Sequence, residues 1–176
     1  MFGWFDLNIV RHICLLGMAV ACVYTDLARG RLYNELTLGG LAVGLILALW
    51  LDVNARGFPH LEHALIGALA GGGLLFLVYI AGGIGAGDVK LMAAVGALSG
   101  RWQLAISALV YSALVGAAIA LGILVWRGEL RKGLKASVRT IFRFRRRETT
   151  DPPLTIPYGV AIGIGTVWAW VEWFAL

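Results

Sequence analysis

The chain has 176 residues, of which 60% are hydrophobic and 14% are charged, and its mean hydropathy is +0.82. Water-soluble domains carry about 25% charged residues, so this composition excludes an ordinary soluble protein. The net charge of +5 would suit nucleic acid or anionic lipid, but most basic residues lie in one segment, 127–155, which favours lipid and no nucleic acid. We therefore expect one all-α integral membrane domain, residues 1–176.

The first apolar segment covers about residues 7–25 and is long enough to cross a bilayer. Arg11 and His12 lie near its beginning, where an arginine side chain can extend to the lipid headgroups. These residues could also begin a secretory signal peptide that is cleaved near Cys22. Because the remainder of the chain is equally apolar, we expect the first span to stay in the mature protein.

The rest of the chain alternates between apolar segments and short polar connections. A polar loop at 26–35 is followed by a second span at 36–51, a third at about 63–81, a short helix ending at Leu98, a fifth span at 102–126 and a sixth that begins near Ile156. The sequence therefore predicts a bundle of about six transmembrane helices. Trp102 and Trp126 at the two ends of the fifth span are typical of aromatic belts at membrane interfaces.

The segment 127–155 is the one extended hydrophilic stretch, and it carries nine Lys or Arg residues. Apolar residues recur within it at helical spacing, from Leu130 to Phe142, which is typical of an amphipathic helix on a membrane surface. A basic loop that only fixes the orientation of the chain is an equally good interpretation.

The distribution of basic residues predicts the orientation. With six spans both termini lie on the same side, and with that side outside, the loops at 26–35, 82–90 and 127–155 face the cytoplasm. These loops hold twelve of the 15 Lys and Arg residues. Such a bias follows the positive-inside rule. Asp26 and Asp88 then both lie at the cytoplasmic edge of the bilayer.

The stretch from Gly82 to Lys90 interrupts the apolar sequence with four glycines and the carboxylate of Asp88. An acid at the centre of a membrane helix costs about 2.5–3.5 kcal/mol, so such residues face a bundle interior or a watery cavity and have a partner. Asp26, which ends the first apolar segment, is the partner we expect. Two acids at matching depth predict an intramembrane aspartyl hydrolase.

Peptide hydrolysis by two aspartates needs one ionised carboxylate to activate water and one protonated carboxyl to polarise the carbonyl group. Asp88 at the beginning of a helix would feel the positive end of the helix dipole, which favours its charged form. We therefore expect Asp26 to be the protonated partner. The glycines before Asp88 would let an extended substrate approach and pair with the backbone. The alternative is a flexible loop in which Asp88 only caps a helix.

These residues resemble the motifs of a known family. Gly85-Ala86-Gly87-Asp88, followed by Val89-Lys90-Leu91, resembles the GxGD motif of type IV prepilin peptidases. Asp26, with Arg31 and Asn34 behind it, resembles the family's first aspartate motif, although Leu32 and Tyr33 stand where that motif has Ile and Pro. Ile156-Pro157-Tyr158-Gly159 resembles its C-terminal Pro-aromatic-Gly element. The resemblance covers about residues 24–165.

The resemblance implies that Asp26 and Asp88 are catalytic and that they cleave the basic leader of prepilin or pseudopilin precursors at the cytoplasmic face of a bacterial inner membrane. The residues that would bind substrate or shape the site are Gly85, Gly87, Arg31, Asn34, Lys90, Pro157, Tyr158 and Gly159. The chain lacks the cysteine-bearing methyltransferase insert of larger relatives and resembles the short form of tight-adherence (Flp) pili. We therefore expect no methyl transfer, no zinc and no cofactor.

Other interpretations remain open at this point. The presenilin-like GxGD proteases are a second enzyme group, but Thr25 stands where that group has a tyrosine before its aspartate. A non-catalytic scaffold or a small transporter would use Asp26 and Asp88 as an ion or proton site. Lys90 would steer the acid pair or simply mark the inner face. The substrate, the scissile bond and the oligomeric state are not given by the sequence.

Overall fold

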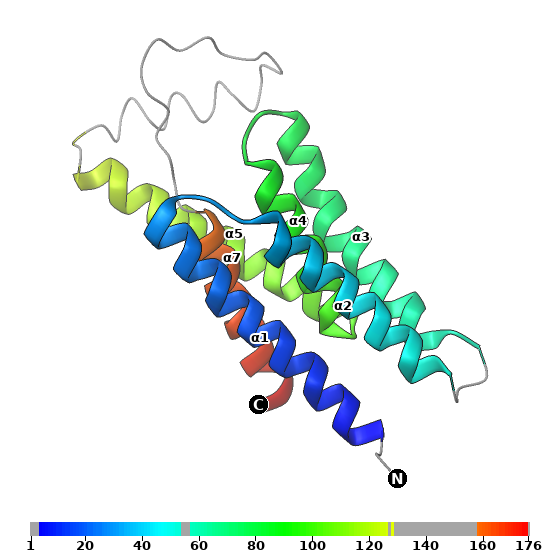
Figure 1. The fold of residues 1–176 in the computed structure, drawn as a ribbon. Helices are drawn as coiled ribbons and strands as arrows, with labels where there is room; N and C mark the ends of the chain where they lie inside the picture. The colour runs from blue at the N-terminus through cyan, green and yellow to red at the C-terminus, as the bar shows by residue number, and fades with distance from the viewer. Residues whose placement is uncertain (1–3, 54–56, 127, 129–157, 176) are drawn as a thin grey trace.

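The computed structural model describes residues 4–53, 57–126, 128 and 158–175, and these residues form a bundle of six helices (Figure 1). The helices are α1 (Trp4–Arg29), α2 (Asn34–Asp52), α3 (Pro59–Ile80), α4 (Ala86–Ser99), α5 (Trp102–Trp126) and α7 (Tyr158–Ala175). The predicted all-α fold is confirmed. The beginning of α1 and the end of α7 lie at the same end of the bundle (Figure 1).

Four of the six helices are long and apolar enough to cross a membrane, namely α1, α2, α3 and α5. The protein is therefore a multi-pass membrane protein. The other two are shorter, because α7 has 18 residues and α4 has only 14. At about 1.5 Å per residue, α4 is about 21 Å long, which is less than the roughly 30 Å hydrocarbon core of a bilayer.

Helix α4 lies at the centre of the bundle, and every residue from Ala94 to Ser99 is buried. Glycines on its neighbours allow this close packing. A Cβ atom on Gly44 of α2 would lie 2.8 Å from the Ala97 backbone, and one on Gly72 of α3 would lie 2.7 Å from the Ala93 side chain. Gly67 of α3 and Gly96 of α4 face each other directly. Small residues at these positions let the helix backbones approach without loss of packing.

Two helix boundaries differ from the prediction in a way that matters for the acids. α1 continues past residue 25 to Arg29, so Asp26 lies within its last turns and not in a loop. Gly30 then ends the helix with a φ of 60°, and its N–H donates to the Asp26 carbonyl at 2.8 Å. α4 begins at Ala86, so Asp88 lies in its first turn. Both carboxylates are therefore held on regular helix backbone.

The expected position of Arg11 at the lipid headgroups is wrong. Its side chain is 1% exposed and lies inside the bundle, where Nη2 donates to the Ala97 carbonyl of α4 at 3.1 Å. The end of α4 offers carbonyl groups that have no hydrogen-bond partner within the helix. Their partial negative charge attracts the guanidinium group and holds it inside the bundle. The segment 127–155, with its two interpretations, lies outside the described residues except for Gly128.

Candidate active site

Asp26 projects from the end of α1 toward the beginning of α7. The Val160 N–H donates to Asp26 Oδ2 at 3.1 Å, and the aspartate is 9% exposed. Because α7 begins at Tyr158, Val160 belongs to its first turn. The carboxylate of one helix therefore caps another, and the positive end of the α7 dipole stabilises its negative charge.

Asp88 lies in the first turn of α4, outside the four helices of membrane-spanning length. Its Oδ2 accepts a hydrogen bond from the Gly85 N–H at 3.1 Å, which forms half of a capping box. Burial raises the pKa of this carboxyl to about 6. The Gly85 hydrogen bond acts in the opposite direction, and the charge of Asp26 raises the pKa further. Asp88 is thus an acid that exchanges its proton near neutral pH.

Leu32, in the short connection between α1 and α2, lies between the two acid-bearing regions. A Cβ atom on Gly87, next to Asp88, would be 3.2 Å from Leu32 Cβ. A Cβ atom on Gly159 would be 3.0 Å from Leu32 Cδ2 and 2.8 Å from Asp26 Oδ2. A Cβ atom at either position would therefore press on a neighbouring side chain. The structure brings Asp26, Asp88 and their neighbouring glycines to one end of the bundle, around one leucine.

Two of the other predicted site residues are joined directly. Lys90 Nζ on α4 donates to Asn34 Oδ1 at the beginning of α2, at 2.9 Å, and both side chains lie at the rim of the bundle. This bond links the segments that follow the two aspartates. The lysine is therefore held against a neutral amide in this structure.

Tyr158, Arg31 and Pro157 have different positions relative to the acids. The pKa of the Tyr158 hydroxyl is raised by burial and by the charge of Asp88, which places its ring on the side of the acid pair. Its ring also packs on α5, where a Cβ atom on Gly116 would lie 2.9 Å from it. Arg31 is exposed and makes no hydrogen bond or ion pair within the described residues. Pro157 lies outside them.

The glycine-rich stretch is a tight turn whose backbone is already engaged. The Gly83 N–H donates to the Val78 carbonyl at 3.1 Å, and the Gly85 N–H is bound by Asp88. Gly82 has a φ of 80°, a conformation that favours glycine. The N–H groups of Gly83 and Gly85 are therefore not free to bind a substrate strand. Pairing of a substrate with the other backbone groups of this stretch stays a prediction. In the part of the chain that the structure describes, no three His, Cys, Asp or Glu residues form a group that could hold a metal ion.

Sequence reasoning missed the roles of Leu32, Val160 and Gly116. Leu32 was identified only as a departure from a motif, although its place six residues after Asp26 was the available signal. Val160 follows the Pro-aromatic-Gly element by one residue and acts through its backbone, so its side-chain type carries no signal. Gly116 lies in the middle of an apolar span and resembles any other small residue.

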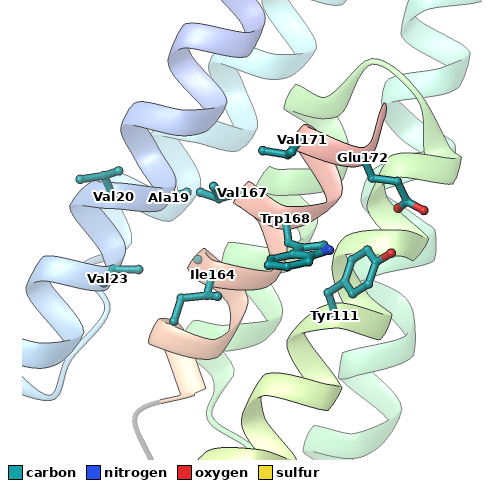
Figure 2. A pocket seen from close by; sticks show the side chains of 10 residues that line it. Ala19, Val20, Val23, Tyr111, Ile164, Val167, Trp168, Val171 and Glu172 are labelled. Atoms are coloured by element: carbon teal, nitrogen blue, oxygen red, sulfur yellow. The ribbon is translucent and has the colours of Figure 1, made fainter. Parts of the chain in front are cut away.

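An open apolar groove of about 510 Å³ lies elsewhere, over the surface of α7 between α1 and α5. Figure 2 shows Trp168 beside Tyr111, with Glu172 one turn further along α7 and Ala19 of α1 beside Val167. The ring centroids of Tyr111 and Trp168 are 6.3 Å apart. Neither aspartate of the acid pair lines this groove, so it is a separate feature of the surface.

Comparison with known proteins gives a consistent result. A family model described as the type IV leader peptidase family matches residues 13–121, which include both aspartates. A prepilin leader peptidase/N-methyltransferase of Aeromonas hydrophila is 38% identical over 134 residues, covering 72% of this chain and 43% of the relative. A protein of the same name from Burkholderia pseudomallei (strain 1026b) is 37% identical over 128 residues, covering 68% and 38%.

A third protein of that name, from Pectobacterium carotovorum subsp. carotovorum, is 32% identical over 159 residues, which is 86% of this chain and 48% of the relative. The chain thus spans less than half the length of the curated relatives it matches. No solved structure gives a significant match to this chain.

Proposed function

This chain belongs to the type IV leader peptidase family, and from that premise we propose that it is a membrane aspartyl endopeptidase that removes the leader peptide from prepilin-like precursors. One observation carries the proposal. Two aspartates, from α1 and α4, lie around Leu32 at one end of an apolar bundle, each accepting a backbone N–H of a helix N-terminal turn. Asp26 and Asp88 are the catalytic pair in this proposal.

The proposed proton assignment reverses the expectation from the sequence. Asp26 accepts the Val160 N–H at the positive end of α7, which stabilises its charged form. Asp88 is half-buried, and burial raises its pKa to about 6. Asp26 is therefore the carboxylate that accepts a proton from water, and Asp88 is the carboxyl group that donates one. The sequence alone suggested the opposite because it could not show that Asp26 caps α7.

The reaction then follows from this arrangement. Asp26 removes a proton from a water molecule as its oxygen bonds to the carbonyl carbon, and Asp88 gives its proton to the carbonyl oxygen. Collapse of the tetrahedral intermediate breaks the C–N bond, and the proton held by Asp26 passes to the leaving amine. As the C–N bond breaks, one hydroxyl group of the intermediate gives its proton to Asp88 and becomes the carbonyl group of the acid product, so both aspartates regain their starting states.

The finer parts of the proposal concern location and substrate class. We place the site at the cytoplasmic face of a bacterial inner membrane, with both termini outside, because the basic residues are concentrated in the loops on that side. The substrates are prepilin or pseudopilin precursors, as the names of the relatives suggest. Membership in the short Flp-type group and the absence of methyl transfer and of a cofactor remain predictions from the motifs.

The test is cleavage of a prepilin precursor by the full chain in proteoliposomes, for the wild type, Asp26→Asn and Asp88→Asn. Each Asn variant keeps the size of the side chain but removes the proton transfer, and we expect each to lose about 10³-fold or more in rate. Leader removal is followed by mass spectrometry, which also identifies the scissile bond.

Asp52→Asn is the matched control. Asp52 is 3% exposed, and its carboxylate accepts the N–H groups of His60 and Leu61 at 3.0 and 2.8 Å. It is a buried, hydrogen-bonded aspartate at the beginning of α3 whose charge also acts on Arg11 of α1, so this variant should lose stability but keep far more activity than either variant of the acid pair. If Asp26→Asn and Asp88→Asn cleave as fast as the wild type, the aspartyl mechanism is wrong, and an ion site in a scaffold or transporter becomes the better interpretation.

A further inference from the structure

Arg11 is a charged side chain placed inside a membrane-spanning helix bundle. It is 1% exposed, and Nη2 donates to the Ala97 carbonyl of α4 at 3.1 Å. The guanidinium group also packs on Gly100, where a Cβ atom would lie 3.0 Å from each of Cζ, Nη1 and Nη2. Within the described residues, Arg11 Nε has no hydrogen-bond partner.

This charge is compensated by the end of α4 and by the buried carboxylate of Asp52 at the end of α2, whose charge acts on Arg11. Gly100, with a φ of 71°, terminates the helix, and the last turn leaves carbonyl groups without a partner inside it. The partial negative charge of a helix C-terminus attracts a cation. Because a buried charge without such partners is strongly unfavourable in a membrane, α1 cannot slide along α4 without losing this compensation.

The contact lies at the opposite end of the same two helices from the acid pair. Arg11 and Asp26 are 15 residues apart on α1, or about 22 Å at 1.5 Å per residue. Asp88 and Gly100 are 12 residues apart on α4, or about 18 Å. The two helices run antiparallel, so fixing Arg11 on the end of α4 fixes the depth of Asp88 relative to Asp26.

Apolar side chains also join the two helices, since Leu15 and Met18 of α1 lie in one buried cluster with Leu98 of α4. Gly44 of α2 and Gly67 and Gly72 of α3 pack directly on α4. Asp26, however, belongs to α1, so these glycine contacts do not set its position relative to Asp88. Arg11 supplies a direct polar bond from α1 to α4 in the described structure.

We propose that Arg11 is a positioning residue, which ties α1 to the C-terminal end of α4 and thereby sets the register in which Asp26 and Asp88 face each other. The proposal rests on the proposed function for its catalytic consequence. Its structural part, the register of α1 against α4, is independent of any activity.

The structural part is tested by the distance between spin labels at Leu27 and Ala86, two exposed positions beside the acids on α1 and α4. The labels are attached to Leu27→Cys and Ala86→Cys in a full chain whose Cys14 and Cys22 are replaced by alanine, and the protein is placed in lipid nanodiscs. We expect Arg11→Met to shift or broaden the distance distribution.

Arg101→Met is the matched control. Arg101 is an exposed guanidinium at the same end of the bundle, 5.9 Å from the Trp173 ring centroid. The same substitution there should leave the distribution unchanged. Arg11→Lys keeps the charge and a donor but lacks the planar group that packs on Gly100, so an intermediate distribution is expected. This variant also provides the test if Arg11→Met does not fold.

The catalytic part is tested with unlabelled protein on a prepilin precursor. A displacement of about 1 Å at the acid pair can lower the rate by about 10²-fold, so we expect Arg11→Met to lower kcat by roughly 10- to 100-fold with KM within about twofold. Arg11→Lys should recover part of that loss, and Arg101→Met should match the wild type.

The two proposals fail in different ways. Unchanged distances in both folded Arg11 variants would overturn the role of Arg11, even if Asp26→Asn and Asp88→Asn are inactive. A shifted distance together with active Asp26→Asn and Asp88→Asn would support the tie between α1 and α4 and overturn the aspartyl mechanism. A loss of kcat without any change in distance would also overturn the positioning role.

Discussion

The two ends of α4 hold opposite charges, and they use the same electrostatic property of the helix. At its beginning, Asp88 lies near the positive end of the dipole and accepts the Gly85 N–H. At its end, the guanidinium of Arg11 lies against Gly100, near the negative end. The difference is exposure, since Asp88 is half-buried and Arg11 is 1% exposed.

That difference separates a reactive end from a structural one. A carboxyl group at the rim of the bundle can exchange protons with water and reach a substrate. A guanidinium enclosed by α1 and α4 can do neither, and its charge serves to hold the helices together. In the two proposals made above, the same dipole supports chemistry at one end and register at the other.

After the loss expected for the two aspartate variants, the largest effect should come from Gly159→Ala. Its new Cβ atom would lie 2.8 Å from Asp26 Oδ2, too close for the carboxylate to keep its place. We expect kcat to fall by roughly 10- to 100-fold, because small displacements of reacting groups have large effects. The measurement is kcat for precursor cleavage, compared with the thermal stability of the same detergent-solubilised samples.

Gly73→Ala is the control for that substitution, since its Cβ atom would meet nothing within 4 Å. It should leave kcat unchanged. Gly87→Ala should have a smaller effect than Gly159→Ala, since its Cβ atom would be 3.2 Å from Leu32 and the loop side chain can move. Full activity of Gly159→Ala would contradict the contact between α7 and Asp26.

The next largest effect on the cleavage rate should come from a change in pH. The proposed mechanism needs Asp88 protonated, and burial raises the pKa of that carboxyl to about 6. Above this value the protonated fraction falls, so kcat/KM should decrease by about tenfold per pH unit. Among the described residues, the titratable groups linked electrostatically to Asp88 are Asp26 on α1 and Tyr158 on α7.

The measurement is kcat/KM for the wild type between pH 5 and pH 8 in the same lipid mixture, which runs from about one unit below to about two units above the expected pKa. The thermal stability of the protein at each pH serves as the control for unfolding. A rate that rises with pH through this range would mean that Asp88 acts in its ionised form, and the proton assignment would have to be reversed.

The smallest effect should come from the exposed bond between Lys90 and Asn34. Its length is 2.9 Å, but surface interactions of this kind contribute about 1 kcal/mol or less. Lys90→Met and Asn34→Ala should each lower kcat/KM by about threefold or less, and the double variant should match the single ones. A loss of about 100-fold in Lys90→Met alone would mean that the lysine acts on the acid pair directly.

Much of the fold follows from the sequence because it depends on local composition. The predicted span at 102–126 has the same bounds as α5, since an apolar run with tryptophan at both ends leaves little choice in a bilayer. That Asp26 and Asp88 lie at the same end of the bundle was also predictable, since both interrupt apolar segments. The residues at which helices end were less predictable, because the polar residues after Asp26 continue α1 up to Gly30.

The sequence by itself determined the membrane-helical class and the family, and it predicted the pair of aspartates as the candidate site. Only the tertiary structure decided what each acid touches, that Leu32 lies between them and that Arg11 is buried. Asp26 meets Val160, 134 residues later, and Arg11 meets Ala97, 86 residues later. Such contacts depend on how whole helices pack, through glycine positions and helix ends that no local pattern identifies.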